Sequence, residues 1–369
     1  YHDSVGFRDL NKNKPFSKGL LYRIWSMTKP VISTATMQLV EKNYLSLDST
    51  IDIFLPQFRE VQILNKNANK IDDSYTSNNI PTIRQLLLHT AGFTYNSSDN
   101  VIGEEYDKRK IFLPGDTTLE QEIDNISQLP LLFEPGSQWH YSVSIDILAR
   151  IIEIITKDKL INILKENIFH PLEMYSTDFF IDENKNKKIV ETLEFSKKNK
   201  KIQNLSLERR KLINYFYPIN NREYSRGGHG LFSTANDYSK FAHMLINGKN
   251  TNGKQIISLE TLTNMRSNNL DPKLFPLEIT SVNTIKDENY INDLDGYGWG
   301  LGFRILMNNT ESNKFGNIGE FGWSGYASTY FLVDPINQLS AVLMMQIIDG
   351  DRVFKQDFYN SIFKNLDSI

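Results

Sequence analysis

The stretch Tyr22-Arg23-Ile24-Trp25-Ser26-Met27-Thr28-Lys29-Pro30 decides how the chain is organised, because it joins an apolar strand-like segment to a helix. The apolar residues that follow it recur with helical spacing to about Glu41. Proline lacks an N–H and is tolerated only in the first helical turn, so Pro30 predicts that this helix begins at about Ser26 or Met27. Ser26 and Lys29 then share one face at its leading edge.

A serine and a lysine in this arrangement suit nucleophilic catalysis. The lysine amine can take up the hydroxyl proton or stabilise the alkoxide. The helix N-terminus adds a favourable dipole, and the free backbone N–H of Ser26 can form half of an oxyanion hole. A second Ser-x-x-Lys, Ser361 to Lys364, lies within a predicted terminal helix, Asp351 to Leu366, where backbone donors are already used. We interpret that copy as an exposed helix face.

Two distant segments supply what a serine–lysine pair lacks. Trp139-His140-Tyr141-Ser142 follows a Pro-Gly turn and precedes a helix, so Tyr141 can act from a rigid loop as general base and then as acid to the leaving group. Gly322-Trp323-Ser324-Gly325-Tyr326 opens a C-terminal hairpin, where small residues let a substrate lie along the strand edge. The plainer alternatives are a half-buried aromatic residue and a tight glycine bend.

The order of elements predicts an α+β fold. Tyr1 to Phe7 and Leu20 to Trp25 are typical of strands, and the last third of the chain predicts an antiparallel hairpin. We therefore expect both chain ends to join one antiparallel sheet flanked by helices, with a helical subdomain inserted. The predicted organisation is one catalytic unit over residues 1–369, with a sheet-containing region (1–75 and 150–369) and a helical region (76–149). Glu183 to Lys211 is expected to be a solvated insertion with local helix.

Composition narrows the function. The chain has 369 residues, 40% of them hydrophobic, which fits a globular enzyme. A net charge of −3 gives no reason to expect nucleic acid or an anionic membrane as partner. There are no cysteines, so disulfides and thiolate chemistry are excluded. The sequence contains no run of about 18 apolar residues, so no membrane span is predicted.

Neither a metal nor a cofactor is expected. The six histidines show no ligand spacing, and the G-x-S-x-G of an α/β-hydrolase is broken because Tyr326 stands where its second glycine belongs. The expected partner is a small-molecule ester or amide. The sequence starts at Tyr1 rather than Met, which leaves both a cytoplasmic and an exported protein possible. The sequence does not indicate an oligomeric state.

Together these segments resemble a known family in the expected order. Tyr22 to Pro30 resembles the first motif of class C β-lactamases, DD-peptidases and family VIII carboxylesterases. The other segments similar to that family are Leu86 to Phe93 with His89-Thr90-Ala91-Gly92, Pro135-Gly136 through Tyr141-Ser142, Gly228 through Thr234 with Asp237, and Phe321 to Gln346. The resemblance implies a β-lactamase/DD-peptidase-like fold that needs no cofactor.

The resemblance also implies a role for each site residue. Ser26 would be the nucleophile, Lys29 its activating neighbour, and Tyr141 the general base and acid. The backbone N–H groups of Ser26 and Tyr326 would form the oxyanion hole. Substrate would bind along Trp323, Ser324 and Gly325.

Two departures from the lactam-cleaving members bear on specificity. Val143 replaces the Asn of the second motif, and Trp323 replaces the Lys or His that begins the third. The missing cation holds a substrate carboxylate, and that bond is charge-assisted. Trp-x-Gly instead resembles the carboxylesterase branch, although Arg226 could restore a carboxylate anchor.

We therefore expect a carboxylesterase that forms an acyl-enzyme on small or medium acyl esters. The alternatives are a β-lactamase or DD-peptidase, an acyltransferase, and a non-catalytic binding protein on the same fold.

Overall fold

A five-stranded antiparallel sheet forms the centre of the computed structural model, which describes residues 1–10, 14–111, 117–279, 292–310, 313 and 316–364. In spatial order its strands are β13 (Leu339–Leu343), β12 (Thr329–Asp334), β11 (Phe321–Gly325), β10 (Arg304–Leu306) and β9 (Tyr297–Trp299). The predicted C-terminal hairpin is β12 and β13, paired from Asp334↔Leu339 to Tyr330↔Leu343.

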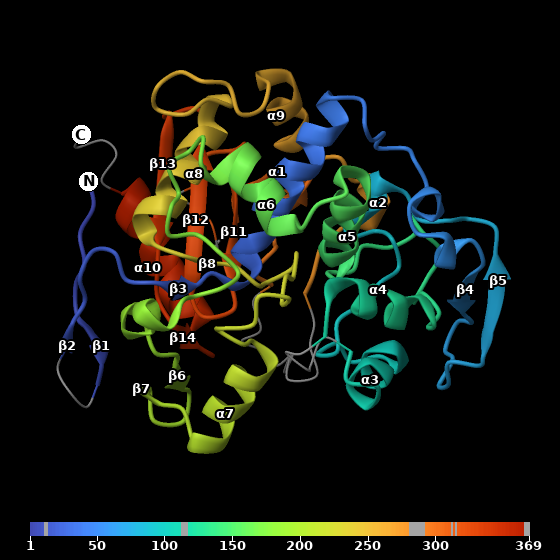
Figure 1. Ribbon diagram of the computed structural model, residues 1–369, viewed down its shortest axis with the longest axis horizontal. Helices are drawn as coiled ribbons and strands as arrows, with labels where there is room; N and C mark the ends of the chain where they lie inside the picture. Colours follow the sequence, from blue (N-terminus) through green and yellow to red (C-terminus); the bar gives the residue numbers. More distant parts are fainter. Residues whose placement is uncertain (11–13, 112–116, 280–291, 311–312, 314–315, 365–369) are drawn as a thin grey trace.

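Helices cover both faces of this sheet, as Figure 1 shows. Helix α8 (Ala235–Asn247) packs on one face, where Tyr238 contacts Phe331 with ring centroids 5.3 Å apart. Helix α10 (Asp351–Phe363) packs on the other, where Tyr359 clusters with Leu332. Because successive side chains of β12 point to opposite faces and both faces are covered, every residue of the strand is buried. This arrangement confirms the predicted α+β fold.

Apart from α1 (Thr28–Glu41), the remaining helices in chain order are α2 (Ile83–Leu87), α3 (Val101–Lys108), α4 (Leu119–Ser127), α5 (Ser144–Thr156), α6 (Leu160–Leu164), α7 (Leu207–Phe216) and α9 (Leu259–Met265). Of these, α2 to α5 lie beyond α1, which runs between them and the sheet, whereas α6, α7 and α9 do not lie on that far side (Figure 1). The division at residues 75/76 and 149/150 stays a prediction, and α5 runs across the second boundary.

The N-terminal strands differ from expectation. Strands β1 (Phe7–Asp9) and β2 (Lys14–Pro15) pair only with each other, and β3 (Tyr22–Arg23) pairs with β8 (Phe232–Ser233). The expectation that both ends of the chain join one sheet is therefore wrong for the described residues. Alternation in a short segment shows that it is extended but does not specify which strand it pairs with.

Residues 183–211 contain more regular structure than expected. Strands β6 (Leu193–Ser196) and β7 (Lys201–Asn204) form a hairpin, and α7 follows it. Strand β6 also pairs in parallel with β14 (Ile347–Ile348), which ties this insertion to the C-terminal part of the chain. A two-stranded sheet, β4 (Val61–Leu64) with β5 (Ser74–Ser77), lies at the opposite end of the molecule in Figure 1.

None of the helices in the described ranges has the length and apolar character needed to cross a membrane.

Candidate active site

Ser26 lies in a 3₁₀ turn, Trp25–Met27, that leads directly into α1. The turn follows β3 and is held there because Ile24 N–H donates to the Leu231 carbonyl at 3.1 Å. Trp25 adopts a φ of +49°, a left-handed conformation that is strained for a bulky residue. The expected helix start at Ser26 or Met27 thus corresponds to this turn, with α1 proper beginning at Thr28.

The end of β11 closes over the same turn. A Cβ on Gly325 would lie 2.4 Å from the Ile24 carbonyl oxygen, so only glycine permits this approach. The next residue, Tyr326, places its ring 5.4 Å from that of Trp25, and its side chain is 53% exposed. The strand edge of Trp323, Ser324 and Gly325 therefore borders the turn that carries Ser26.

Lys29 lies at the centre of the site and is 1% exposed. Its Nζ donates to Ser26 Oγ at 3.3 Å and to the Gly228 carbonyl at 2.7 Å. The amine also lies over two rings, at 4.7 Å from the centroid of Tyr141 and 5.2 Å from that of Tyr95. The spacing of three residues on one helix face accounts for the contact with Ser26.

Tyr141 lies in the loop that precedes α5, within a cluster of aromatic rings. Its phenolic oxygen accepts a hydrogen bond of 3.1 Å from the indole Nε1–H of Trp323. His89 packs on the same ring at 4.7 Å. Trp299 packs against Trp323 at 4.7 Å and donates from its own indole to the Leu87 carbonyl. Buried aromatic contacts of this kind hold the phenol in one orientation.

The structure brings most of the predicted site residues together. Ser26 and Lys29 are in direct contact, Lys29 lies over Tyr141, and Trp323 contacts the phenol. In the described part of the chain Tyr141 reaches Ser26 through Lys29 rather than by a hydrogen bond of its own. Catalytic hydrogen bonds are often long without substrate, and here Lys29 Nζ contacts Ser26 Oγ on one side and the ring of Tyr141 on the other.

Arg226 is not placed to hold a substrate carboxylate. Its side chain and that of Glu122 are both fully buried, with Nη2 at 3.4 Å from Oε1. The same nitrogen donates to Thr117 Oγ1 at 2.8 Å. The guanidinium is engaged by α4, so the possible carboxylate anchor inferred from the sequence is wrong.

The histidines near the site are neutral. Burial and the positive charges of Lys29 and Arg226 hold the pKa of His229 well below its usual range. Burial, with Lys29 and His140, does the same to the pKa of His89, and burial lowers the pKa of His140 to about 4. These rings therefore contribute shape and hydrogen bonds rather than charge.

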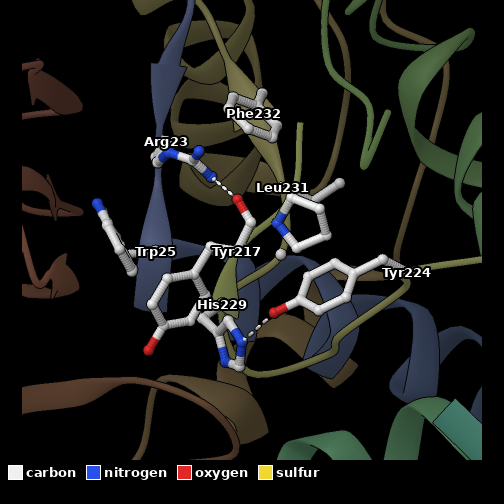
Figure 2. A pocket seen from close by; sticks show the side chains of 9 residues that line it. Arg23, Trp25, Tyr217, Tyr224, His229, Leu231 and Phe232 are labelled. Atoms are coloured by element: carbon white, nitrogen blue, oxygen red, sulfur yellow. Dashed lines mark hydrogen bonds between the residues drawn. The ribbon is translucent and has the colours of Figure 1, made fainter. Parts of the chain in front are cut away.

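A second group of aromatic rings surrounds Trp25, the residue before Ser26, and Figure 2 shows it. Tyr217 packs edge-on between Trp25, at 4.7 Å, and His229, at 5.1 Å. Tyr224 contacts His229 Nε2 at 3.0 Å, and Arg23 donates to the Tyr217 carbonyl at 2.6 Å. These bonds fix this group of rings against strands β3 and β8.

Sequence reasoning missed several residues of this site. Tyr95 and Asp146 come from segments without a recognised motif, and Gly228 was named only as the start of the family-like segment Gly228 through Thr234, without a role of its own. The one signal available for Asp146 was an acidic residue in the first turn of an amphipathic helix, directly after the Tyr141 segment. Among the described residues no group of three or more His, Asp or Glu side chains could hold a metal ion.

The fold is that of serine hydrolases related to penicillin-binding proteins. A sequence model described as beta-lactamase matches residues 1–362, and the chain belongs to the beta-lactamase family.

Three similar proteins illustrate the range of this family. Protein Rv1367c of Mycobacterium tuberculosis is 25% identical over 93% of this chain and 82% of its own length. Esterase EstB of Burkholderia gladioli is 30% identical over 48% of this chain and 43% of its own. The solved structure of EstCE1, described as a hydrolase with promiscuous acyltransferase activity, has a TM-score of 0.78 and 22% identity, covering 98% of this chain and 90% of its own.

Proposed function

We propose that this chain is a carboxylesterase that forms an acyl-enzyme on Ser26, with small or medium acyl esters as substrates. Two contacts carry the proposal, that of Lys29 with Ser26 and that of the Trp323 indole with Tyr141. Lys29 Nζ lies 3.3 Å from Ser26 Oγ, and the phenolic oxygen of Tyr141 is held by a neutral indole rather than by a cation.

The proposed reaction begins with attack of Ser26 Oγ on the ester carbonyl carbon. The serine proton passes by way of the Lys29 amine to the oxygen of Tyr141, which enters the step as a phenolate and leaves it as a phenol. The oxyanion is held by the backbone N–H groups of Ser26 and Tyr326, and Tyr141 returns the proton to the departing alcohol. Water then attacks the acyl-serine by the reverse route and releases the acid.

The preference for esters rests on charge. The cation that would pair with a lactam carboxylate is absent from position 323, and Arg226 is engaged with Glu122. Aromatic rings pack against Trp25, next to Ser26, and lie over Lys29, which suits an uncharged acyl or alcohol group. The match to esterase EstB, and the description of EstCE1 as a hydrolase, support this assignment.

The test compares two substrate classes on the purified chain. We expect turnover of p-nitrophenyl acetate or butyrate, with only weak turnover of nitrocefin. A fluorophosphonate probe should label Ser26 under the same conditions. Efficient nitrocefin turnover without esterase activity would favour a β-lactamase, and absence of labelling and turnover would favour a binding protein.

Acyl transfer is a second candidate, favoured by the structural similarity to EstCE1. The same acyl-enzyme would be captured by an alcohol in place of water. Adding a primary alcohol to the ester assay distinguishes the two reactions. A transferase yields the new ester, whereas a strict hydrolase yields only the acid.

A further inference from the structure

Asp146 is a buried acidic side chain next to the site that the proposed reaction does not use. It lies in the first turn of α5, five residues after Tyr141, and it is fully buried. Its Oδ1 accepts a hydrogen bond of 2.9 Å from the backbone N–H of Gly228. Burying a carboxylate costs free energy unless it is paired or hydrogen-bonded, so a carboxylate at this position needs a specific physical reason.

Gly228 connects this carboxylate to the catalytic lysine. Its N–H donates to Asp146, and its carbonyl accepts from Lys29 Nζ at 2.7 Å. A Cβ at position 228 would lie 2.4 Å from Asp146 Oδ2 and 2.9 Å from the Tyr95 hydroxyl. The carboxylate therefore occupies the space of the missing side chain, and residue 228 is held from both of its backbone polar groups.

The second carboxylate oxygen, Oδ2, is buried and has no hydrogen-bond partner among the described residues. Burial raises the pKa of Asp146, while Lys29, the Gly228 N–H and Arg226 act in the opposite direction and Glu122 adds to the increase. The charged and titratable groups that face Asp146 are Lys29 of α1, Glu122 of α4, Tyr95 of the loop before α3, and Tyr224 and Arg226 of the loop before β8. Lys29 is the only one of these that also contacts Ser26.

We propose that Asp146 is a positioning residue whose ionised carboxylate fixes Gly228 and places a negative charge beside Lys29, so that the amine is held against Ser26. This inference rests on the proposed function, because it concerns the activation of the same nucleophile. The carboxylate acts through one glycine on the lysine and does not touch the substrate.

The test is the pH dependence of Asp146→Asn. Asparagine keeps the size and an oxygen acceptor but stays neutral at every pH. Because burial raises the Asp146 pKa, the wild-type carboxyl becomes neutral at a higher pH than an ordinary aspartate as the pH falls. We expect kcat/KM of the variant to be lower by roughly 10- to 100-fold in mildly alkaline buffer, as for the loss of an orienting partner. The two enzymes should converge as the pH falls.

The matched control is Asp237→Asn in α8. Asp237 is also a buried carboxylate that accepts a backbone N–H, from Ser176 at 2.7 Å, but it lies against Thr177 rather than Lys29. We expect this variant to lose stability with an unchanged pH profile of kcat/KM. If the ratio of kcat/KM for Asp146→Asn to kcat/KM for the wild type is the same at all pH values, Asp146 has only a structural role and the proposal is overturned.

A second variant covers the case in which Asp146→Asn does not fold. In Gly228→Ala the new methyl group displaces the carboxylate, so the same loss at alkaline pH and the same convergence are expected. Wild-type labelling by a fluorophosphonate separates the two hypotheses. Unlabelled wild type would refute the serine hydrolase itself, whereas a labelled wild type with variants of unchanged pH profile would refute only the role of Asp146.

Discussion

The indole Nε1–H of Trp323 donates a 3.1 Å hydrogen bond to the phenolic oxygen of Tyr141. The two rings also pack together, with centroids 5.3 Å apart. The hydrogen bond and the ring packing together fix the position of the phenolic oxygen. A neutral side chain on strand β11 thus assists the phenol without offering a charge to the substrate.

Trp323→Phe tests that hydrogen bond. The ring packing is largely kept and the donor is lost, so we expect kcat on p-nitrophenyl butyrate to fall about 3- to 10-fold, corresponding to about 0.5–1.5 kcal/mol for one hydrogen bond. Trp299→Phe is the matched control, because its indole donates to the Leu87 carbonyl instead. We expect the control variant to have a lower Tm than the wild type but nearly the same kcat. Equal loss of kcat in both variants would argue against a specific role for the Trp323 donor.

Trp323→Lys tests the specificity argument. A lysine at this position restores a cation at the start of the third motif and can pair with a carboxylate. We expect faster acylation by carboxylate-bearing lactams, measured with nitrocefin by stopped flow. Trp323→Phe serves as the uncharged comparison. If both variants acylate at the same rate, the missing cation does not set the ester preference.

Ser26→Ala tests the nucleophile. We expect loss of ester turnover and of fluorophosphonate labelling, with Tm and circular dichroism close to wild type, because Ser26 is only half-buried and the substitution removes one oxygen atom. Ser361→Ala, in the second Ser-x-x-Lys on α10, is the control and should remain fully active. If Ser26→Ala hydrolyses esters normally, Ser26 is not the nucleophile.

Tyr141→Phe tests the proton transfer. The ring contacts with His89 and Lys29 remain, and the acid–base group is lost, so kcat should fall by about 10²-fold or more. Tyr75→Phe removes a hydroxyl that bonds Glu134 at the edge of the molecule and should leave kcat as it is. An unaltered kcat in Tyr141→Phe would exclude the phenol from the mechanism.

Glu320 predicts how stability depends on pH. Burial raises the pKa of this carboxyl from 4.5 to about 7, against the opposing effect of Arg304. The folded protein then binds the proton more tightly than the unfolded chain, so stability falls as the pH rises from about 4.5 to about 7. Glu320→Gln does not lose stability in this way. Its free energy of unfolding in urea, relative to the wild type, should therefore increase with pH by about 3 kcal/mol and level off above about pH 7. Parallel stability curves would contradict the assignment.

Much of the fold could be predicted from the sequence, and the reasons are local. Pro30 predicts the start of α1 to within about a turn, and the hairpin expected in the last third of the chain is β12 with β13. Strand partners were harder, because Tyr22 and Arg23 pair with residues more than two hundred positions away and nothing local specifies that partner. In the site, too, contacts between residues close in sequence could be predicted and contacts between distant segments could not. Ser26 and Lys29 are three residues apart on one helix, whereas Asp146 reaches Lys29 only through the backbone of Gly228.

The buried pair of Arg226 and Glu122 has a mechanical consequence. It ties the loop before β8 to helix α4, and separating the two side chains would leave two unpaired ions in the buried interior. Breaking such a pair costs about 3–5 kcal/mol, far more than thermal energy. The loop that carries Gly228 should therefore keep its position relative to α4 when substrate binds, so that substrates are selected by whether they fit a site that does not adjust to them.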